Sequence, residues 1–319
     1  MRLVAALLAA ALLVAGLAGC GGSGAEPGAP DGASLMLDFT PNAVHTGIYA
    51  AQRRGYYEDA GVDLEVREPG DPGAVPKLLA AGRVDFAILD IHDLGIARER
   101  GLDVVGTMAI VQRPLAAIIA PSSGPVRSPR DLEGRTVGVT GLPSDEAVVD
   151  SELRADGGDP ARVHRVTIGF NAVSALAADR VDAATGFWNA EAIALARRGV
   201  PNRVFKVNRY GAPSYPELIL TASRQTIEQE PDLVDAVLAA TTRGYEFTYA
   251  HPDQALDDLL AAVPSLDQSE EAAQLRALLP DLRPSPLDPA VLRGWAAWDL
   301  EHGLLERPLD VSAAFRLPG

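Results

Sequence analysis

From Ser34 onward the sequence alternates short apolar segments with longer amphipathic ones, and this alternation narrows the possible folds more than any other feature. In the segment 62–66 apolar and acidic residues alternate one by one, as in a half-buried strand, whereas 75–81 has helical periodicity. The pattern predicts strands at 34–39, 62–66, 84–89, 104–111, 135–139 and 163–167, a short strand after Asp182, and strands at 204–207 and 218–221. It predicts helices at 41–54, 75–81, up to Arg100, from the capping residue Ser144, at 190–198 and over most of the chain after Pro231. Strands that alternate with helices favour an α/β fold with a mainly parallel sheet and helices on its faces.

A seven-residue repeat divides the chain into two similar parts. Residues 79–85 read Leu-Ala-Ala-Gly-Arg-Val-Asp, and residues 176–182 read Leu-Ala-Ala-Asp-Arg-Val-Asp. In both copies a predicted helix ends, the chain turns, and a predicted strand begins. We therefore expect two similar α/β lobes, one formed by residues 33–121 and 220–319 and the other by residues 122–219. Two lobes joined at a hinge leave a ligand cleft between them, at the carboxyl ends of the strands.

The N-terminal segment predicts export. Arg2 precedes an uncharged run of sixteen residues, mostly Leu, Ala and Val, that starts at Leu3. As a helix this run would extend about 24 Å, short of a roughly 30 Å hydrocarbon core, so we expect a signal peptide over residues 1–19. The stretch Leu-Ala-Gly-Cys ending at Cys20 is similar to a bacterial lipobox, which implies cleavage before Cys20 and its lipidation. An ordinary signal peptide with an incidental cysteine is the alternative. Residues 20–32, with their Gly and Pro, would be a flexible tether.

Charge and cysteine content exclude several classes of protein. The chain has 28 Lys and Arg residues against 43 Asp and Glu, and its net charge of −15 argues against a nucleic-acid-binding protein. Cys20 is the single cysteine, so an intrachain disulfide and a cysteine metal cluster are impossible. We expect an extracytoplasmic, monomeric body that is held to the cell membrane through Cys20.

Signatures of common enzymes are absent from the sequence. It contains no Gly-x-x-x-x-Gly-Lys-Ser/Thr loop, no Gly-x-Ser-x-Gly elbow and no His-Glu-x-x-His helix. The five histidines are scattered, without the spacing of metal ligands. We therefore predict no catalytic residue, no metal site and no cofactor.

Polar and aromatic residues follow three of the predicted strands. After the first strand, Asn42 can cap the next helix, and His45 lies in the first turn of that helix. A helix start at the carboxyl end of a strand is also a place where a ligand would bind. In Gly186-Phe-Trp-Asn-Ala-Glu191, Trp188 and Glu191 are three residues apart on a helix and share a face. A Trp beside a carboxylate suits a flat heteroaromatic ring with an exocyclic amine. Tyr215 could form the opposite stacking wall.

Purely structural roles are the alternative for each of these residues. Asn42 could serve only as a cap, and His45 could be a buried imidazole. Trp188 could be a packed side chain next to a solvent-facing Glu191, and Tyr215 could cover the hinge.

Three segments resemble motifs of the thiamine-pyrimidine-precursor family. They are Leu37–Tyr49 with the following Gly55-Tyr-Tyr, Gly186–Glu191, and Tyr210–Leu218, whereas Asp131–Gly138 is common to wider relatives. The family comprises substrate-binding proteins of bacterial ABC importers and fungal pyrimidine synthases on the same fold. The resemblance covers roughly residues 34–255. It implies a two-lobed fold of the periplasmic-binding-protein type (type II), and it makes the following residues ligand candidates: Asp38, Phe39, Asn42, His45, Trp188, Asn189, Glu191 and Tyr215.

The sequence departs from the family pattern at the first motif. Phe39 replaces the usual Trp, and Ala43-Val44 replaces Thr-Asn. The ligand implied by the resemblance is a hydroxymethyl- or formylaminomethyl-aminopyrimidine, and another flat heterocycle such as riboflavin is the alternative.

The fungal branch of the family is enzymatic. Resemblance to that branch implies a lysine that holds pyridoxal phosphate just after the strand that corresponds to residues 84–89, and a cysteine-rich iron site near residues 213–218. This chain has no lysine between Lys77 and Lys206 and no cysteine after Cys20. We therefore expect a binding protein, with a synthase as the alternative. It would deliver its ligand to a membrane permease whose ATPase drives import. A lipid-tethered sensor or scaffold is a third possibility.

Overall fold

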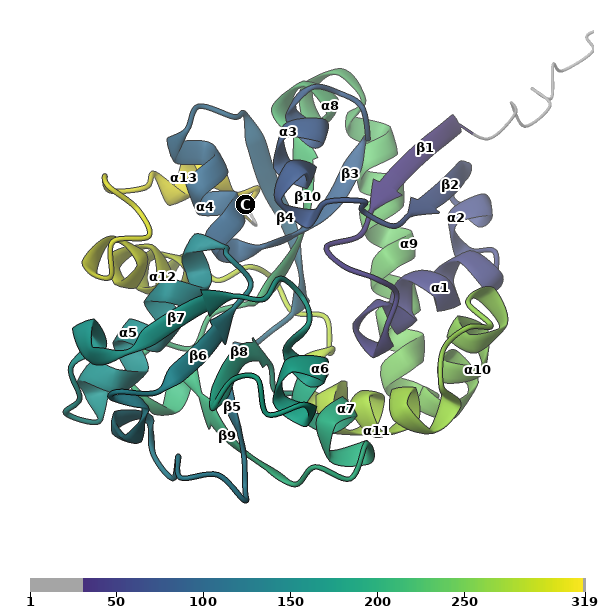
Figure 1. The fold of residues 1–319 in the computed structure, drawn as a ribbon. Helices are drawn as coiled ribbons and strands as arrows, with labels where there is room; N and C mark the ends of the chain where they lie inside the picture. Colours follow the sequence, from purple (N-terminus) through teal and green to yellow (C-terminus); the bar gives the residue numbers. More distant parts are fainter. Residues whose placement is uncertain (1–30, 318–319) are drawn as a thin grey trace, which may run out of the picture.

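The computed structural model describes residues 31–317, which form two α/β lobes (Figure 1). The predicted signal peptide and the lipidation of Cys20 lie outside the described residues. Within them, every helix is too short or too polar to pass through a bilayer.

The first lobe is built on a five-stranded sheet of order β2-β1-β3-β10-β4. Its strands are β1 (Asp31–Met36), β2 (Val62–Arg67), β3 (Phe86–Asp90), β4 (Val104–Val111) and β10 (Leu218–Ser223). The strand β1 is parallel to β2 and β3, whereas β10 is antiparallel to β3 and β4. The helical segments of this part are η1 (Ala43–His45), α1 (Thr46–Arg53), α2 (Tyr56–Asp59), α3 (Val75–Ala80) and α4 (Ile91–Glu99).

The second lobe repeats this arrangement with the order β7-β6-β8-β5-β9. Its strands are β5 (Ala116–Pro121), β6 (Thr136–Val139), β7 (His164–Thr167), β8 (Ala183–Phe187) and β9 (Asn202–Lys206), and its helices include α5 (Pro143–Ala155), α6 (Ala172–Ala177) and α7 (Glu191–Arg197). Here β6 is parallel to β7 and β8, and β5 is antiparallel to β8 and β9. The α/β prediction is confirmed, but both sheets are mixed, because the strand by which the chain enters each sheet from the other one, β10 in the first lobe and β5 in the second, runs opposite to its neighbours.

The repeated heptapeptide has the same structural role in both lobes. The Asp85 carboxylate accepts a hydrogen bond from the Ser34 backbone N–H at 2.7 Å, and Asp182 accepts one from Thr136 at 2.9 Å. Each bond joins a residue of one strand, β1 or β6, to the start of the parallel neighbour, β3 or β8. The differing position has φ of 62° at Gly82 and 52° at Asp179, so both copies turn through the left-handed conformation.

The C-terminal third is helical, as predicted. It contains α8 (Arg224–Gln229), α9 (Pro231–Ala250), α10 (Pro252–Ala262), α11 (Gln268–Leu278), α12 (Pro289–Glu301) and α13 (Val311–Ala314). The long helix α9 packs directly on α1, where Gly244 lies against the Gly47 carbonyl. The helix α12 supplies Asp299 to His92 in α4, and α11 reaches across to α7 of the second lobe. The chain passes between the sheets after β4 and after β9, so β5 (Ala116–Pro121) pairs in the second sheet although the predicted boundary at residue 122 assigned it to the first lobe, and β10 begins at Leu218, two residues before the predicted return at residue 220.

Candidate functional site

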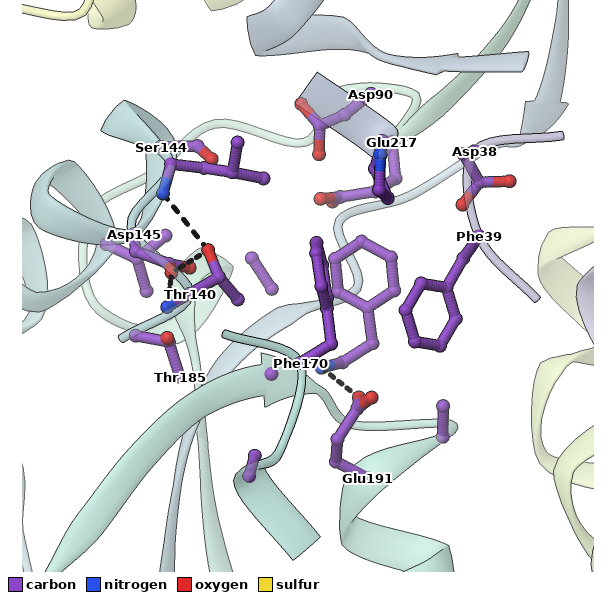
Figure 2. A pocket seen from close by; sticks show the side chains of 18 of the residues that line it. Asp38, Phe39, Asp90, Thr140, Ser144, Asp145, Phe170, Thr185, Glu191 and Glu217 are labelled. Carbon is purple, nitrogen blue, oxygen red and sulfur yellow. Dashed lines mark hydrogen bonds between the residues drawn. The ribbon is translucent and has the colours of Figure 1, made fainter. Parts of the chain in front are cut away.

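A cleft lies between the lobes at the carboxyl ends of the parallel strands, where a ligand site was expected (Figure 2). It holds about 1130 Å³ of empty space, including the part open to solvent. Residues after β1 and β3 form one wall, and residues after β6, β7 and β8 form the other. Glu217 and Leu218 lie at the hinge between them.

Carboxyl groups dominate the polar lining of this cleft. The six are Asp38, Asp90, Asp93, Asp145, Glu191 and Glu217. The lining includes neither Lys nor Arg, and His92 is its single histidine. No group of three or more His, Cys, Asp or Glu side chains within residues 31–317 is arranged to hold a metal ion. The acidic lining therefore suits a ligand that donates hydrogen bonds.

Asp90 and Glu217 lie near each other at the cleft floor (Figure 2). Asp90 caps α4 by accepting from the His92 N–H at 2.8 Å, and Glu217 accepts from the Leu115 N–H at 2.6 Å. Burial raises the pKa of Glu217 to about 7 and the pKa of Asp90 well above its ordinary value. Near neutral pH this pair holds a proton, so it can both donate to a ligand and accept from it.

The second lobe presents two further carboxyl groups. Asp145 accepts from both the backbone N–H and the hydroxyl of Thr140, and Glu191 accepts from the Phe187 N–H at 2.8 Å (Figure 2). Burial raises the pKa of Asp145 and of Glu191. Both groups are fixed in orientation by these backbone bonds before a ligand arrives.

Asn189 is the polar residue of the lining whose hydrogen bonding is least satisfied. Its side chain is fully buried, and neither the amide oxygen nor the amide nitrogen has a partner within the protein. Glu217 Oε1 is likewise buried and unpartnered. Buried polar groups are usually paired, and each unpaired group costs about 1–3 kcal/mol. These atoms are therefore available to a bound molecule.

Aromatic rings from both lobes meet across the cleft. The centroids of Phe39, from the loop after β1, and Phe170, from the loop after β7, are 5.0 Å apart at an interplanar angle of 46°. Phe187 also lines the cleft. Phe170 is 45% exposed, so part of its ring is open to solvent. A flat ring between these phenylalanines would replace their mutual contact by stacking.

Five of the eight predicted ligand residues line the cleft: Asp38, Phe39, Asn42, Asn189 and Glu191. Asn42 also has the predicted capping role, since its side chain accepts from the Val44 N–H.

The other three predicted residues lie behind the lining. His45 is fully buried, and its Nε2 lies 2.8 Å from Asp38 Oδ1, so it holds a lining residue in place. Trp188 donates its indole N–H to the Pro114 carbonyl, and the Lys206 ammonium lies 3.4 Å from its ring centroid. Direct contact of His45 or Trp188 with a ligand stays a prediction.

Tyr215 is fully buried, and its hydroxyl oxygen lies 3.1 Å from His92 Nε2. Burial alone would lower the pKa of His92, but the Asp299 carboxylate at 2.8 Å raises it to about 9. The imidazolium therefore donates to Asp299 and to the Tyr215 oxygen. Ligand contact by Tyr215 also stays a prediction.

Asp90, Asp93, Asp145, Phe170 and Glu217 line the cleft without having been predicted. Asp90 follows an apolar strand directly, which was a usable signal. Glu217 lies within the segment Tyr210–Leu218, which resembles a family motif.

A family model described as NMT1/THI5 like matches residues 42–255. The formylaminopyrimidine-binding protein of Halalkalibacterium halodurans is 32% identical over 292 residues, which cover 88% of each chain. A 4-amino-5-hydroxymethyl-2-methylpyrimidine phosphate synthase of Legionella pneumophila is 29% identical over 236 residues, covering 73% of this chain and 74% of that one. The riboflavin-binding protein RibY of Chloroflexus aurantiacus is 28% identical over 299 residues, covering 88% and 84%.

The alkanesulfonate-binding protein SsuA from Xanthomonas axonopodis pv. citri, solved with MOPS bound, matches with a TM-score of 0.74 over 91% of this chain and 99% of that one. At 17% identity this likeness concerns the fold alone. It confirms the predicted periplasmic-binding-protein-like architecture.

Proposed function

The chain belongs to the NMT1/THI5-like family, and on this premise we propose that it is the substrate-binding component of an ABC importer for a pyrimidine precursor of thiamine. Its ligand is a hydroxymethyl- or formylaminomethyl-aminopyrimidine. The Asn189 amide supports this ligand most directly, because a buried amide without partners requires a bound group with both a donor and an acceptor. The amine and ring nitrogen of an aminopyrimidine provide both.

The remaining lining completes the recognition. The ring stacks between Phe39 and Phe170, whose centroids are 5.0 Å apart in this structure, and Glu191 accepts from the exocyclic amine. The Asp90–Glu217 pair at the floor donates to a ring nitrogen. His45, Trp188 and Tyr215 support Asp38 and the hinge from behind, and the proposal assigns them to the site in this sense.

Binding without catalysis is favoured over the synthase activity of some relatives. The pyridoxal phosphate implied by the synthase branch does not fit, because the cleft is lined by neither lysine nor arginine to hold its aldehyde or its phosphate. Lys77 is exposed on α3, and Lys206 lies over the Trp188 ring.

The two-lobed fold supports capture and delivery. A ligand favours the closed form by its higher affinity for that form, and a permease then recognises the closed lobes. Arg197 of α7 already contacts Ser269 of α11 and its capping residue Asp267 across the lobes. Anchoring through Cys20 outside the cytoplasm and a monomeric state belong to the same proposal.

A thermal-shift screen of the purified protein tests the ligand class. The panel contains 4-amino-5-hydroxymethyl-2-methylpyrimidine, its aminomethyl and formylaminomethyl relatives, thiamine and riboflavin. A ligand at a hundredfold excess over its Kd adds about 2.7 kcal/mol of stability, and the melting temperature rises by a few degrees. Stabilisation by the aminopyrimidines alone is the expected result. Stabilisation by riboflavin alone would favour the riboflavin alternative, and no shift with any compound would contradict the proposed function.

A further inference from the structure

Carboxyl groups dominate the charge of the cleft lining. Six carboxyl groups face the cavity, and no Lys or Arg side chain of residues 31–317 lines it. The cationic His92 does not offset this, since Asp299 and the Tyr215 oxygen take up both of its ring nitrogens. An anionic group entering the cleft would lose water and meet no free positive side chain.

Backbone N–H groups at strand ends are the second means by which a protein binds anions. At three junctions facing this cleft, the chain's own carboxylates occupy such groups. Asp90 accepts from the His92 N–H after β3, Asp145 from the Thr140 N–H after β6, and Glu191 from the Phe187 N–H after β8. Within residues 31–317, neither a Lys or Arg side chain of the lining nor any of these three backbone N–H groups is left to hold an anion.

We propose that this cleft selects its ligand by charge: it binds neutral or cationic heteroaromatic amines and rejects the same molecules when they carry a phosphate or sulfonate group. The proposal rests on the proposed function and specifies which form of the pyrimidine is bound, namely the unphosphorylated one. The fold does not impose this choice, because the alkanesulfonate-binding SsuA shares it. Selection comes from the acids at the junctions, which repel one partner while they accept hydrogen bonds from the other.

Isothermal titration calorimetry of the purified protein with matched pairs of ligands tests the selection. One pair is 4-amino-5-hydroxymethyl-2-methylpyrimidine and its phosphate monoester, and the other is riboflavin and its 5′-phosphate. The alcohol of the preferred pair is expected to bind at least a hundredfold more tightly than its phosphate, which corresponds to about 2.7 kcal/mol. Inorganic phosphate and MOPS are expected not to bind.

The outcomes separate this inference from the proposed function. Equal binding of an alcohol and its phosphate, or binding of MOPS, overturns charge selection and leaves a pyrimidine- or flavin-binding protein. Charge selection within the riboflavin pair alone supports the inference and contradicts the pyrimidine ligand. Binding of none of the four compounds overturns both.

Neutral variants test the assigned residues. Asp145→Asn keeps the shape of the side chain and removes its charge, so the preference for the alcohol over the phosphate is expected to fall at least fivefold. Asp159→Asn is the matched control, because Asp159 is exposed, caps η4 (Pro160–Arg162) through the Ala161 N–H and lies outside the cleft lining. If the Asp145→Asn protein does not fold, Asp93→Asn provides a second measurement of the ratio between the Kd of the phosphate and the Kd of the alcohol. An unchanged ratio in the folded variants overturns the assignment.

Discussion

Replacing Asn189 by leucine is expected to stabilise the protein and to weaken ligand binding at the same time. Asn189 is fully buried in the cleft wall, and neither end of its amide has a partner within the protein. A buried amide without partners costs about 1–3 kcal/mol, whereas an apolar side chain of the same size in its place carries no such cost. We therefore expect the free energy of unfolding to rise by about 1–2 kcal/mol. The melting temperature would rise by roughly 2–4 °C per kcal/mol.

Ligand affinity should move in the opposite direction. If Asn189 donates to and accepts from the ligand, leucine removes two hydrogen bonds and leaves the corresponding ligand atoms unpaired. The expected loss is at least tenfold in Kd, or about 1.4 kcal/mol. Calorimetric unfolding without ligand and isothermal titration with the aminopyrimidine measure the two effects on the same samples.

Asn202→Leu is the matched control. Asn202 lies outside the cleft lining, and its amide donates to the Ala192 carbonyl at 2.9 Å. Its replacement should lower stability and leave Kd unchanged, because the lost hydrogen bond belongs to the fold. A destabilised Asn189→Leu protein, or one with wild-type affinity, would refute the argument that this amide is kept for the ligand.

Three further predictions concern binding, pH and packing. Glu191→Ala should weaken aminopyrimidine binding at least tenfold in titration calorimetry, and unchanged affinity would remove Glu191 from the site. Because burial raises the pKa of Glu217 from 4.5 to about 7, its carboxyl keeps a proton in the folded chain that the unfolded chain has lost, so stability should fall as pH rises from about 5 to 7. Urea unfolding across that range should show a flatter profile for Glu217→Gln, and an identical profile would contradict this. Gly244→Ala should cost about 1–3 kcal/mol in urea unfolding, since its Cβ would lie 2.0 Å from the Gly47 carbonyl oxygen, whereas Gly294→Ala, with nothing within 4 Å, should be neutral or stabilising.

The lobes and most elements were predictable because they follow from local patterns. The repeated heptapeptide places an aspartate at the same junction twice, and the structure gives Asp85 and Asp182 the same hydrogen bond. The strand β5 was missed although Gln112, Arg113 and Pro114 separate its apolar residues from those of β4 and were a usable turn signal. Its reversed direction arises from the crossing between lobes, which no local pattern records.

The site was predictable only in part, for two physical reasons. Glu191 and Asn189 belong to a motif beside aromatic residues, whereas Asp90 is one acid after an apolar run in a chain with 43 acidic residues. Successive residues point to opposite sides of the chain, so either Phe187 or Trp188 could have faced the ligand. The structure places Phe187 in the lining and Trp188 against Pro114.

The equivalence of the two sheets explains why the cleft is acidic on both sides. By their place in the strand order, β1 corresponds to β6 and β3 to β8. Acidic residues of the cleft lining lie at or after the ends of these strands in both lobes. Asp38 after β1 corresponds to Asp145 after β6, and Asp90 at the end of β3 corresponds to Glu191 after β8. Closing such lobes without a ligand brings like charges together, and burial raises the pKa of these groups where a shift is seen. A ligand that donates hydrogen bonds would offset that cost, so the selection that we propose for these acids would also make closure depend on the ligand.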